Sequence, residues 1–430
     1  MKQIKLKHRN TCRLCDSKKV ELAVKMAPIP PQELYLDSAE AAKSVERFPV
    51  DLYFCDDCGH VQQLDILDAS TLWQDYTYES SKAKGMMEHF ESFTDEVLAD
   101  YTSDKELGYV LDVGSNDGAL LSCFKRRGFN VIGVDPAENL AAQATAAGIL
   151  TLPELFTVET ANTILQSHGK ANIITVFNAF AHADNLIEIA EGIRVLLDDD
   201  GVFYFEVQYL LDVIDKVLIG TIFHEHMSHH SLLPMMQFLT AQGMEVIDVV
   251  RVPIQHGALI GKVQLKGAAR PVHSRVEQLV NLENNRQLKS LQIIKGFGDK
   301  ITSLQKQANI FRQRVIEEGA SVAGYGAARS GQSLISQTQI QGVIKYIVDN
   351  HPQKIGKFPA GDGIPIVATS ELYNRNPEYT VILAWVHVRV IIENNLNYLR
   401  QGGTFVVLTP SLILVDKDNV SLFLSNYGKS

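Results

Sequence analysis

The sequence predicts an α/β protein in which a small N-terminal metal-binding module is followed by two Rossmann-like domains. Three observations support this. Cys-x-x-Cys occurs twice near the N-terminus, strand-like and helix-like segments alternate from Tyr109 onward, and a second alternating block begins near Ser321. Such alternation with nearly continuous apolar strands is typical of a parallel sheet covered on both faces. The predicted units are 1–70 (metal-binding module), 71–271 (first α/β domain), 272–320 (helical connector) and 321–430 (second α/β domain).

Length and composition narrow the class of protein. A chain of 430 residues favours two or three domains, and 46% hydrophobic with 21% charged residues is typical of a globular protein. The formal net charge is −10 and no long Lys/Arg run occurs, so we expect no nucleic-acid partner. No stretch approaches the ~18 apolar residues of a membrane span, and the first ten residues do not resemble a signal peptide. We therefore expect a cytoplasmic protein with no membrane partner.

The element pattern is regular in both α/β blocks. Strands are predicted at 109–113, 130–134, 171–177 and 202–207, and then at 321–324, 343–348, 380–384 and 404–407. Residues 84–102 have apolar side chains at three- and four-residue spacing and predict a helix. Residues 272–319 predict one or two amphipathic helices that join the two domains.

Two cysteine pairs predict the metal site. Cys12-Arg-Leu-Cys15 and Cys55-Asp-Asp-Cys58 each place two thiolates on a tight turn, and together they supply four soft ligands for one zinc ion. Four cysteines leave no open position, so the zinc would be structural. The alternative is two unrelated redox or core pairs. Cys123 is most simply a small core residue.

A glycine-containing turn after the first strand predicts a cofactor loop. Asp112-Val-Gly-Ser-Asn-Asp-Gly118 precedes a helical pattern, and the next strand ends in Asp135, where a carboxylate can accept ribose hydroxyls. The acidic Asp117 disfavours a pyrophosphate and favours a cationic cofactor, so S-adenosylmethionine is expected rather than a nicotinamide. The alternative is a turn that only joins strand to helix. The candidate cofactor residues are Asp112, Gly114, Ser115, Asn116, Gly118 and Asp135.

A histidine-rich segment at 220–231 predicts acid–base chemistry. It contains His224, Glu225 and His226, and histidine is the natural general base near neutral pH. A His-Glu-x-x-His metal site is not completed, because residue 228 is serine. For His229 and His230 an interior structural role is favoured. Two further candidates are His256 and His182, the latter at the carboxyl end of a predicted strand, where open α/β sheets bind ligands.

These motifs together resemble the bacterial sugar C-methyltransferase family, which acts on nucleotide-linked deoxysugars. The resemblance spans essentially the whole chain. It includes the two cysteine pairs, Tyr76-Thr-Tyr-Glu-Ser-Ser81, 110–118 with Asp135, Asn178-Ala-Phe-Ala-His182, 206–212, 221–226, Gly324-Tyr-Gly-Ala-Ala-Arg-Ser-Gly331, 348–354 and 363–366.

The resemblance implies a Rossmann-like methyltransferase domain, a nucleotide-sugar substrate and a set of site residues. A 4-keto sugar would lose its C3 proton to His226, and Glu225 would assist the enolate or orient the sugar. His182, Tyr76 and His224 would belong to the same catalytic group, and Asn178 would join the cofactor residues. The implied substrate contacts are Tyr78, Phe223, His256, Tyr325 and Arg329, with Arg329 and Lys354 as phosphate partners.

Phe223 stands where the family usually has tyrosine, so one phenolic donor is missing. This leaves open O- or N-methylation, or an isomerase that uses the same base; His224 or His229 would then be candidates to replace the phenol. A zinc-bearing scaffold that binds a nucleotide without catalysis is a further alternative. The loop at Gly324 is itself Rossmann-like and would suit NAD, with Asp349 as its ribose acid.

Overall fold

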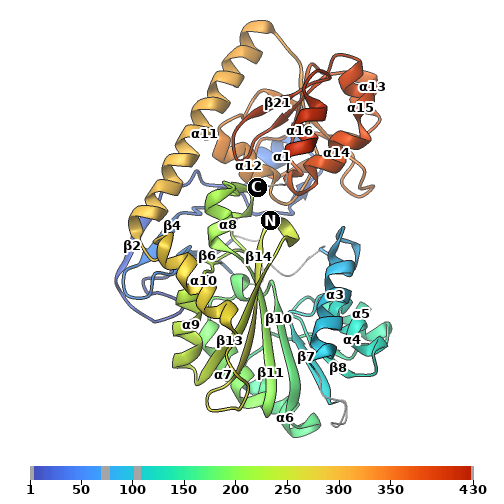
Figure 1. The fold of residues 1–430 in the computed structure, drawn as a ribbon. Helices are drawn as coiled ribbons and strands as arrows, with labels where there is room; N and C mark the ends of the chain where they lie inside the picture. Colours follow the sequence, from blue (N-terminus) through green and yellow to red (C-terminus); the bar gives the residue numbers. More distant parts are fainter. Residues whose placement is uncertain (1–3, 69–77, 101–107, 428–430) are drawn as a thin grey trace.

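The computed structural model describes residues 4–68, 78–100 and 108–427. The N-terminal module (dark blue in Figure 1) is built from short strands. They are β1 (Leu6–His8), β2 (Val20–Val24), β3 (Tyr35–Leu36), β4 (Leu52–Cys55), β5 (Val61–Gln62) and β6 (Asp65–Leu67), with the short helix α1 (Ala39–Lys43). One sheet of the module has the order β12-β5-β4-β2, and β12 (Ser228–His229) comes from the histidine-rich segment. The module therefore shares a sheet with the domain that follows it.

The first α/β domain is a seven-stranded sheet of order β13-β14-β11-β10-β7-β8-β9. Its strands are β7 (Tyr109–Val113), β8 (Asn130–Val134), β9 (Thr151–Leu152), β10 (Ala171–Phe177), β11 (Leu197–Gln208), β13 (Met244–Val252) and β14 (Ala258–Leu265). Three predicted strands match β7, β8 and β10, and the predicted strand 202–207 lies inside the longer β11. The sheet is parallel from β9 to β11, whereas β14 and β13 add an antiparallel edge that was not predicted.

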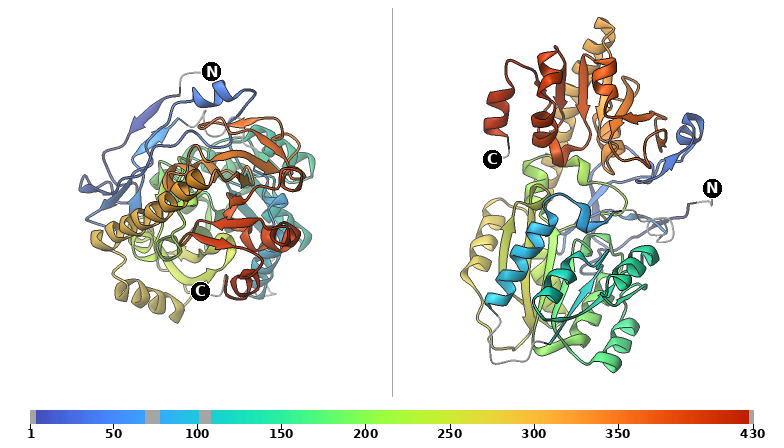
Figure 2. Two further views of the ribbon diagram at one scale, coloured as in Figure 1. Left: turned by 90° about the horizontal axis from the view of Figure 1, so that it is seen from above. Right: turned by 90° about the vertical axis from the view of Figure 1, so that its right-hand side faces the viewer.

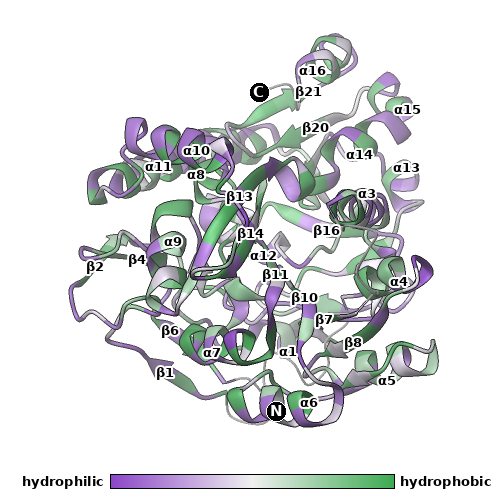
Figure 3. Cartoon of the chain, turned by 60° about the horizontal axis from the view of Figure 1, so that its bottom comes forward, coloured by the Kyte–Doolittle hydropathy of each residue, from purple (hydrophilic) through white to green (hydrophobic). Residues whose placement is uncertain are grey.

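Helices cover both faces of this sheet. Alternate strand residues separate the two faces. Val110 and Ile173 pack with the aromatic side chains of α3 (Met86–Ala99) and α4 (Ala119–Arg126). Leu111 and Ile174 pack with α6 (Val158–His168) and α7 (Leu186–Leu196) on the other face. Buried apolar strands covered on both sides are expected for a parallel sheet, and Figure 3 shows the apolar strands between more polar helices. The remaining helices are α5 (Glu138–Ala146), α8 (Leu210–Asp215) and α9 (Leu232–Ala241).

Two helices lie in the predicted connector. They are α10 (Ser274–Asn285) and the 28-residue α11 (Leu291–Glu318). The buried residues of α11 recur every three or four positions from Ile294 to Val315, so a single stripe faces the protein. Figure 1 shows α11 rising from the first domain along the second. The predicted domain boundaries stay predictions.

The second α/β domain has a six-stranded sheet of order β18-β16-β15-β19-β20-β21, parallel except for β21. The strands are β15 (Val322–Tyr325), β16 (Ile344–Asp349), β18 (Ile366–Ala368), β19 (Tyr379–Ile382), β20 (Thr404–Val407) and β21 (Ile413–Val415), and the helices are α12 (Gly331–Thr338), α13 (Glu371–Arg375), α14 (Val388–Asn394), α15 (Leu396–Arg400) and α16 (Val420–Asn426). All four strands predicted here overlap observed ones. A short strand, β17 (Phe358–Pro359), pairs with β3 and joins this domain to the module.

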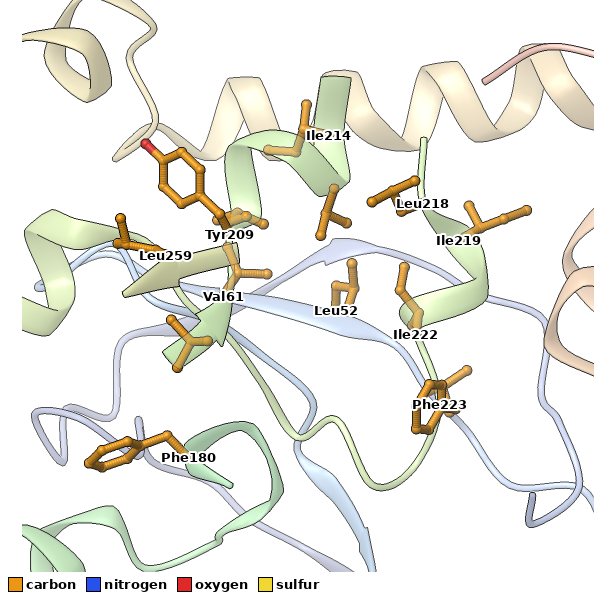
Figure 4. Packing of buried hydrophobic residues seen from close by; sticks show 14 of the residues in the cluster. Leu52, Val61, Phe180, Tyr209, Ile214, Leu218, Ile219, Ile222, Phe223 and Leu259 are labelled. Atoms are coloured by element: carbon orange, nitrogen blue, oxygen red, sulfur yellow. The ribbon is translucent and has the colours of Figure 1, made fainter. Parts of the chain in front are cut away.

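The N-terminal module packs against both α/β domains. Figure 4 shows module residues such as Leu52 and Val61 in the same apolar cluster as Ile222 and Phe223 of the first domain. The Gln337 side chain of α12 bonds to the backbone of Ala27 at 2.9 and 2.7 Å. The two views in Figure 2 show the module lying alongside both domains.

Candidate functional site

The four cysteines of the two pairs meet in the module. Their Sγ atoms lie within 4.8 Å of one another, with Cys12–Cys58 and Cys15–Cys55 each at 3.6 Å. Tetrahedral zinc with sulfur ligands at ~2.3 Å requires sulfur atoms about 3.8 Å apart. The cluster therefore fits zinc, and four protein ligands make the site structural. Cys123 is buried on α4, as expected for a core residue.

A cavity of about 910 Å³ lies between the two α/β domains. Its walls include the segments that follow β7, β8 and β10 in the first domain and β15, β16 and β19 in the second. Ligands of open α/β sheets bind outside the carboxyl ends of the strands. Here two such edges face one shared space, which is large enough for two small molecules together.

The cofactor loop is held by the acid that ends the next strand. Asp135 accepts hydrogen bonds from the backbone N–H of Asn116 (2.8 Å) and of Ala137 (2.9 Å). Gly114 has φ of 75°, and a Cβ at this position would lie 2.7 Å from the Cβ of Ala179, so only glycine fits. Burial, opposed by a hydrogen bond from Thr175 and aided by the charge of Asp135, raises the pKa of Asp112 to about 7.

These residues suit the expected cofactor. Asp112, Gly114, Ser115, Asn116, Asp135 and Asn178 all line the cavity. The Ser115 hydroxyl is buried against Gly133 of β8, so at this position the loop backbone and not the hydroxyl is available to a ligand. Gly118 does not line the cavity; it has φ of 77° and begins α4, where its Cβ position is crowded by Ile149.

His226 is held as a neutral imidazole. Its Nδ1 lies 2.7 Å from the carbonyl oxygen of Thr221, which can only accept, so Nδ1 carries the hydrogen and Nε2 keeps a lone pair. Burial and the neighbouring His182 hold its pKa well below the usual range. The ring lies 4.0 Å from that of Phe223 and stacks on His182 at 5.0 Å. All three side chains line the cavity.

The module supports the backbone of this histidine segment. The Gln63 side-chain amide donates to the carbonyl oxygens of Phe223 and His226, both at 3.0 Å. Its backbone N–H donates to Met227 at 2.8 Å. The buried Gln63 thus ties β5 of the zinc module to the turn that carries the base.

Other predicted residues lie elsewhere. His224 and Glu225 are buried and do not line the cavity; the His224 ring faces Phe48, and burial raises the pKa of Glu225. His229 and His230 lie in the interior, as expected. His256 packs on Trp385 and Tyr325 packs near Phe405, and neither lines the cavity. Tyr78 and Arg329 do line it, whereas Tyr76 lies outside the described residues.

The second domain holds its loop in the same way as the first. We call this arrangement, in which an acid at the end of the second strand accepts two backbone N–H groups, a latch. Asp349, which ends β16, accepts hydrogen bonds from the backbone N–H of Ala327 (2.6 Å) and His351 (2.7 Å). Beside it, Arg329 and Lys354 lie 3.9 and 3.8 Å from the carboxylate of Glu33, which belongs to the module.

Glu33 and Trp385 are two of the residues of the cavity wall that were not predicted. Glu33 reaches the second domain because β3 pairs with β17, a contact between segments more than 300 residues apart that leaves no local signal. Trp385 follows β19, and its Nε1 donates to Ser330 at 2.9 Å. Its place after a predicted strand was a usable signal, because that is the ligand-binding edge.

Comparisons with known proteins agree with this architecture. Three family models match in order: "Putative zinc binding domain" at residues 12–73, "Methyltransferase domain" at 86–249 and "C-methyltransferase C-terminal domain" at 253–410. The C-methyltransferase NovU of Streptomyces niveus is 29% identical over 93% of this chain and 95% of its own length.

Two solved methyltransferase structures resemble less than half of this chain. An S-adenosylmethionine-dependent methyltransferase from Clostridium acetobutylicum is 13% identical and covers 44% of this chain and 94% of its own, with a TM-score of 0.35. Magnesium protoporphyrin IX methyltransferase from Synechocystis is 16% identical over 45% and 91%, with a TM-score of 0.33.

The cofactor loop, the cavity and the family models together define an S-adenosylmethionine-dependent methyltransferase with a structural zinc module. The models for all three parts match in sequence order and the chain is similar to a C-methyltransferase over nearly its whole length, in agreement with the resemblance in its motifs. No helix in the described ranges is long and apolar enough to cross a bilayer; the cytoplasmic location stays a prediction.

Proposed function

We propose that this methyltransferase acts on C3 of a nucleotide-linked 4-keto deoxysugar, with His226 as the base. The observation that carries the proposal is the neutral His226 imidazole in a cavity shared by the cofactor loop and the second domain. Its Nδ1 is bound to Thr221, so Nε2 is the nitrogen that can take a proton.

The chemistry follows from the acidity of a carbon next to a ketone. Nε2 of His226 removes the C3 proton, and the C–H electron pair becomes the enolate with its charge on the C4 oxygen. Bound S-adenosylmethionine would supply an electrophilic methyl group, which bonds to C3 as the carbonyl re-forms; the methyl–sulfur bond breaks and its electron pair stays on sulfur, so that S-adenosylhomocysteine leaves. The Thr221 carbonyl keeps accepting the Nδ1–H while His226 is protonated, which stabilises the imidazolium. His182 holds the ring in place by stacking.

Glu225 is assigned as the donor that assists the enolate. Burial raises its pKa, opposed by the charge of Arg329, which favours the neutral acid that can donate a hydrogen bond. Phe223 cannot perform this role, because it has no hydroxyl. Since Glu225 does not line the cavity, this role requires a small rearrangement when the sugar binds.

The nucleotide is assigned to the second domain. Arg329 and Lys354 supply two cations at the loop that begins at Gly324. A guanidinium can donate hydrogen bonds to two oxygens of one phosphate. Tyr78 lies on the same wall, with the Arg329 guanidinium 5.7 Å from its ring. The sugar would then extend from the second domain toward His226.

The test uses the complete zinc-bound protein with S-adenosylmethionine and candidate 4-keto sugar nucleotides. Mass spectrometry should find a product heavier by one methylene, and NMR should place the new methyl group on C3. In deuterated water with S-adenosylhomocysteine, C3 should exchange its proton for deuterium in the parent protein and not in His226→Asn. Methylation at oxygen or nitrogen, or exchange that survives in the variant, would overturn the proposal.

A further inference from the structure

Asn178 occupies the ligand-binding point of the first sheet. The chain runs outward through β7, β8 and β9 and then returns to β10, which lies on the other side of β7, so the strand order reverses between β7 and β10. Ligands bind at such a reversal. Gly114 follows β7 and Asn178 follows β10, and both line the cavity at this point.

A buried pair behind Asn178 holds its side chain. Glu206 of β11 is fully buried, and its Oε1 accepts a hydrogen bond from Nδ2 of Asn178 at 2.7 Å. The backbone N–H of Asn178 donates to the Glu206 carbonyl at 2.8 Å. The other carboxylate oxygen, Oε2, is bound by Nε2 of His89 from α3. Both oxygens of one buried carboxylate are thus committed to fixed partners.

These contacts determine which way the Asn178 amide faces. Because the NH₂ group of Asn178 donates to Glu206, the carbonyl oxygen of the same amide faces away from that side chain. Asn178 lines the cavity, and its backbone φ of 56° is left-handed, a conformation that asparagine tolerates better than most residues. The hydrogen bond from His89 prevents the Glu206 carboxylate from turning. Burial lowers the pKa of His89, but the hydrogen bond and the charge of Glu206 outweigh this effect and raise the pKa.

We infer that Glu206 and His89 are positioning residues that present the Asn178 carbonyl oxygen to the cationic group of the methyl donor. The negative end of an amide dipole attracts a positive charge, and a buried site strengthens that attraction. The oxygen gains this interaction with the sulfonium of S-adenosylmethionine and not with the neutral thioether of S-adenosylhomocysteine. The inference rests on the proposed use of this donor.

The test compares the dissociation constants of the two cofactors by calorimetry, without substrate or turnover. In Asn178→Gly, which suits the left-handed backbone, we expect S-adenosylmethionine to bind about tenfold more weakly, or about 1.4 kcal/mol, while S-adenosylhomocysteine changes little. Glu206→Leu should show the same selective loss, because it frees the amide to turn. His89→Gln keeps a donor to Glu206 and should retain the parent selectivity, whereas His89→Phe should lose part of it.

A matched control comes from the same helix. Thr94 is buried on α3 and donates to the Phe90 carbonyl at 2.7 Å, so Thr94→Val removes a hydrogen bond of α3 that does not reach Glu206. It should leave the ratio of the two constants unchanged. Equal weakening of both cofactors in a folded Asn178→Gly protein would overturn the inference, even if Glu206→Leu fails to fold. Failure of the parent to bind either cofactor would instead overturn the proposed function.

Discussion

The two α/β domains hold their loops with the same backbone device and present different side chains to the cavity. In each, the acid that ends the second strand accepts two backbone N–H groups, Asp135 in the first domain and Asp349 in the second. The first loop then continues through Asn116 and Asp117, whereas the second continues through alanines to Arg329. Under the proposed function, the comparison teaches that the latch holds the loop backbone of each site, and that the residues beside it decide which charge the site accepts.

Replacing the base that lies between the two loops should have the largest effect. His226→Asn keeps a donor for the Thr221 carbonyl and removes Nε2, so we expect kcat to fall about 10³-fold, within the usual range for a general base. Binding of both ligands should persist, because neither loop is touched. Steady-state kinetics and calorimetry would check this, with the exposed His168→Asn as control. A variant that keeps parent turnover would show that another group is the base.

Replacing each latch acid, Asp135 or Asp349, by asparagine tests whether the two loops bind different ligands. An asparagine can accept only one of the two backbone N–H groups and turns its NH₂ toward the other, so each latch should open. Asp135→Asn should weaken the binding of S-adenosylmethionine about 100-fold, on the basis of ~1.5–3 kcal/mol for a charged hydrogen bond. The affinity of this variant for the sugar nucleotide should remain that of the parent. Asp349→Asn should do the reverse. If either variant weakened both ligands equally, the two sites would not be separable.

Removing the Arg329 guanidinium tests whether the charge of the second loop determines its ligand. Arg329→Gln should raise KM for the nucleotide sugar about tenfold, from a loss of ~1.5 kcal/mol in a charge-assisted contact. It should leave the dissociation constant of S-adenosylmethionine near that of the parent. The KM of the parent should also rise more steeply with salt than that of the variant. Lys345→Gln is the control, because Lys345 is exposed near the start of β16, at the opposite end of the strand from Asp349.

The smallest effect is expected from the acid beside these cations. Glu33 lies near both Arg329 and Lys354 and lowers the positive charge available to a phosphate. Glu33→Gln should therefore lower KM for the nucleotide sugar about two- to threefold, in line with a partly exposed ion pair worth under ~1 kcal/mol. An increase in KM would indicate instead that Glu33 orients the two cations.

Much of the fold could be predicted because its signals are local. The apolar runs of β7, β8 and β10 and the two cysteine pairs each stand within a few residues of sequence. The cofactor loop could be predicted for the same reason, although Gly118 begins a helix and does not line the cavity.

What the sequence missed depends on distant contacts. The pair formed by His89 and Glu206 joins residues 117 positions apart, and nothing in either segment names its partner. β12 joins the module's sheet although it is only two residues long and follows the base in sequence. The placement of His226 against the cavity and of His224 against Phe48 of the module depends on how this turn is held, which periodicity cannot determine for so short a segment.

The hydrogen bonds between Gln63 and the turn that carries His226 have a consequence for how the sequence can evolve. Gln63 lies a few residues beyond the second cysteine pair and holds the backbone of Phe223 and His226. The two ends of this contact lie about 160 positions apart, and because the acceptors are backbone carbonyls, the contact depends on residue type only at Gln63. A relative that exchanged its zinc module by recombination would have to bring a matching glutamine, so the module and the histidine turn should evolve as one unit.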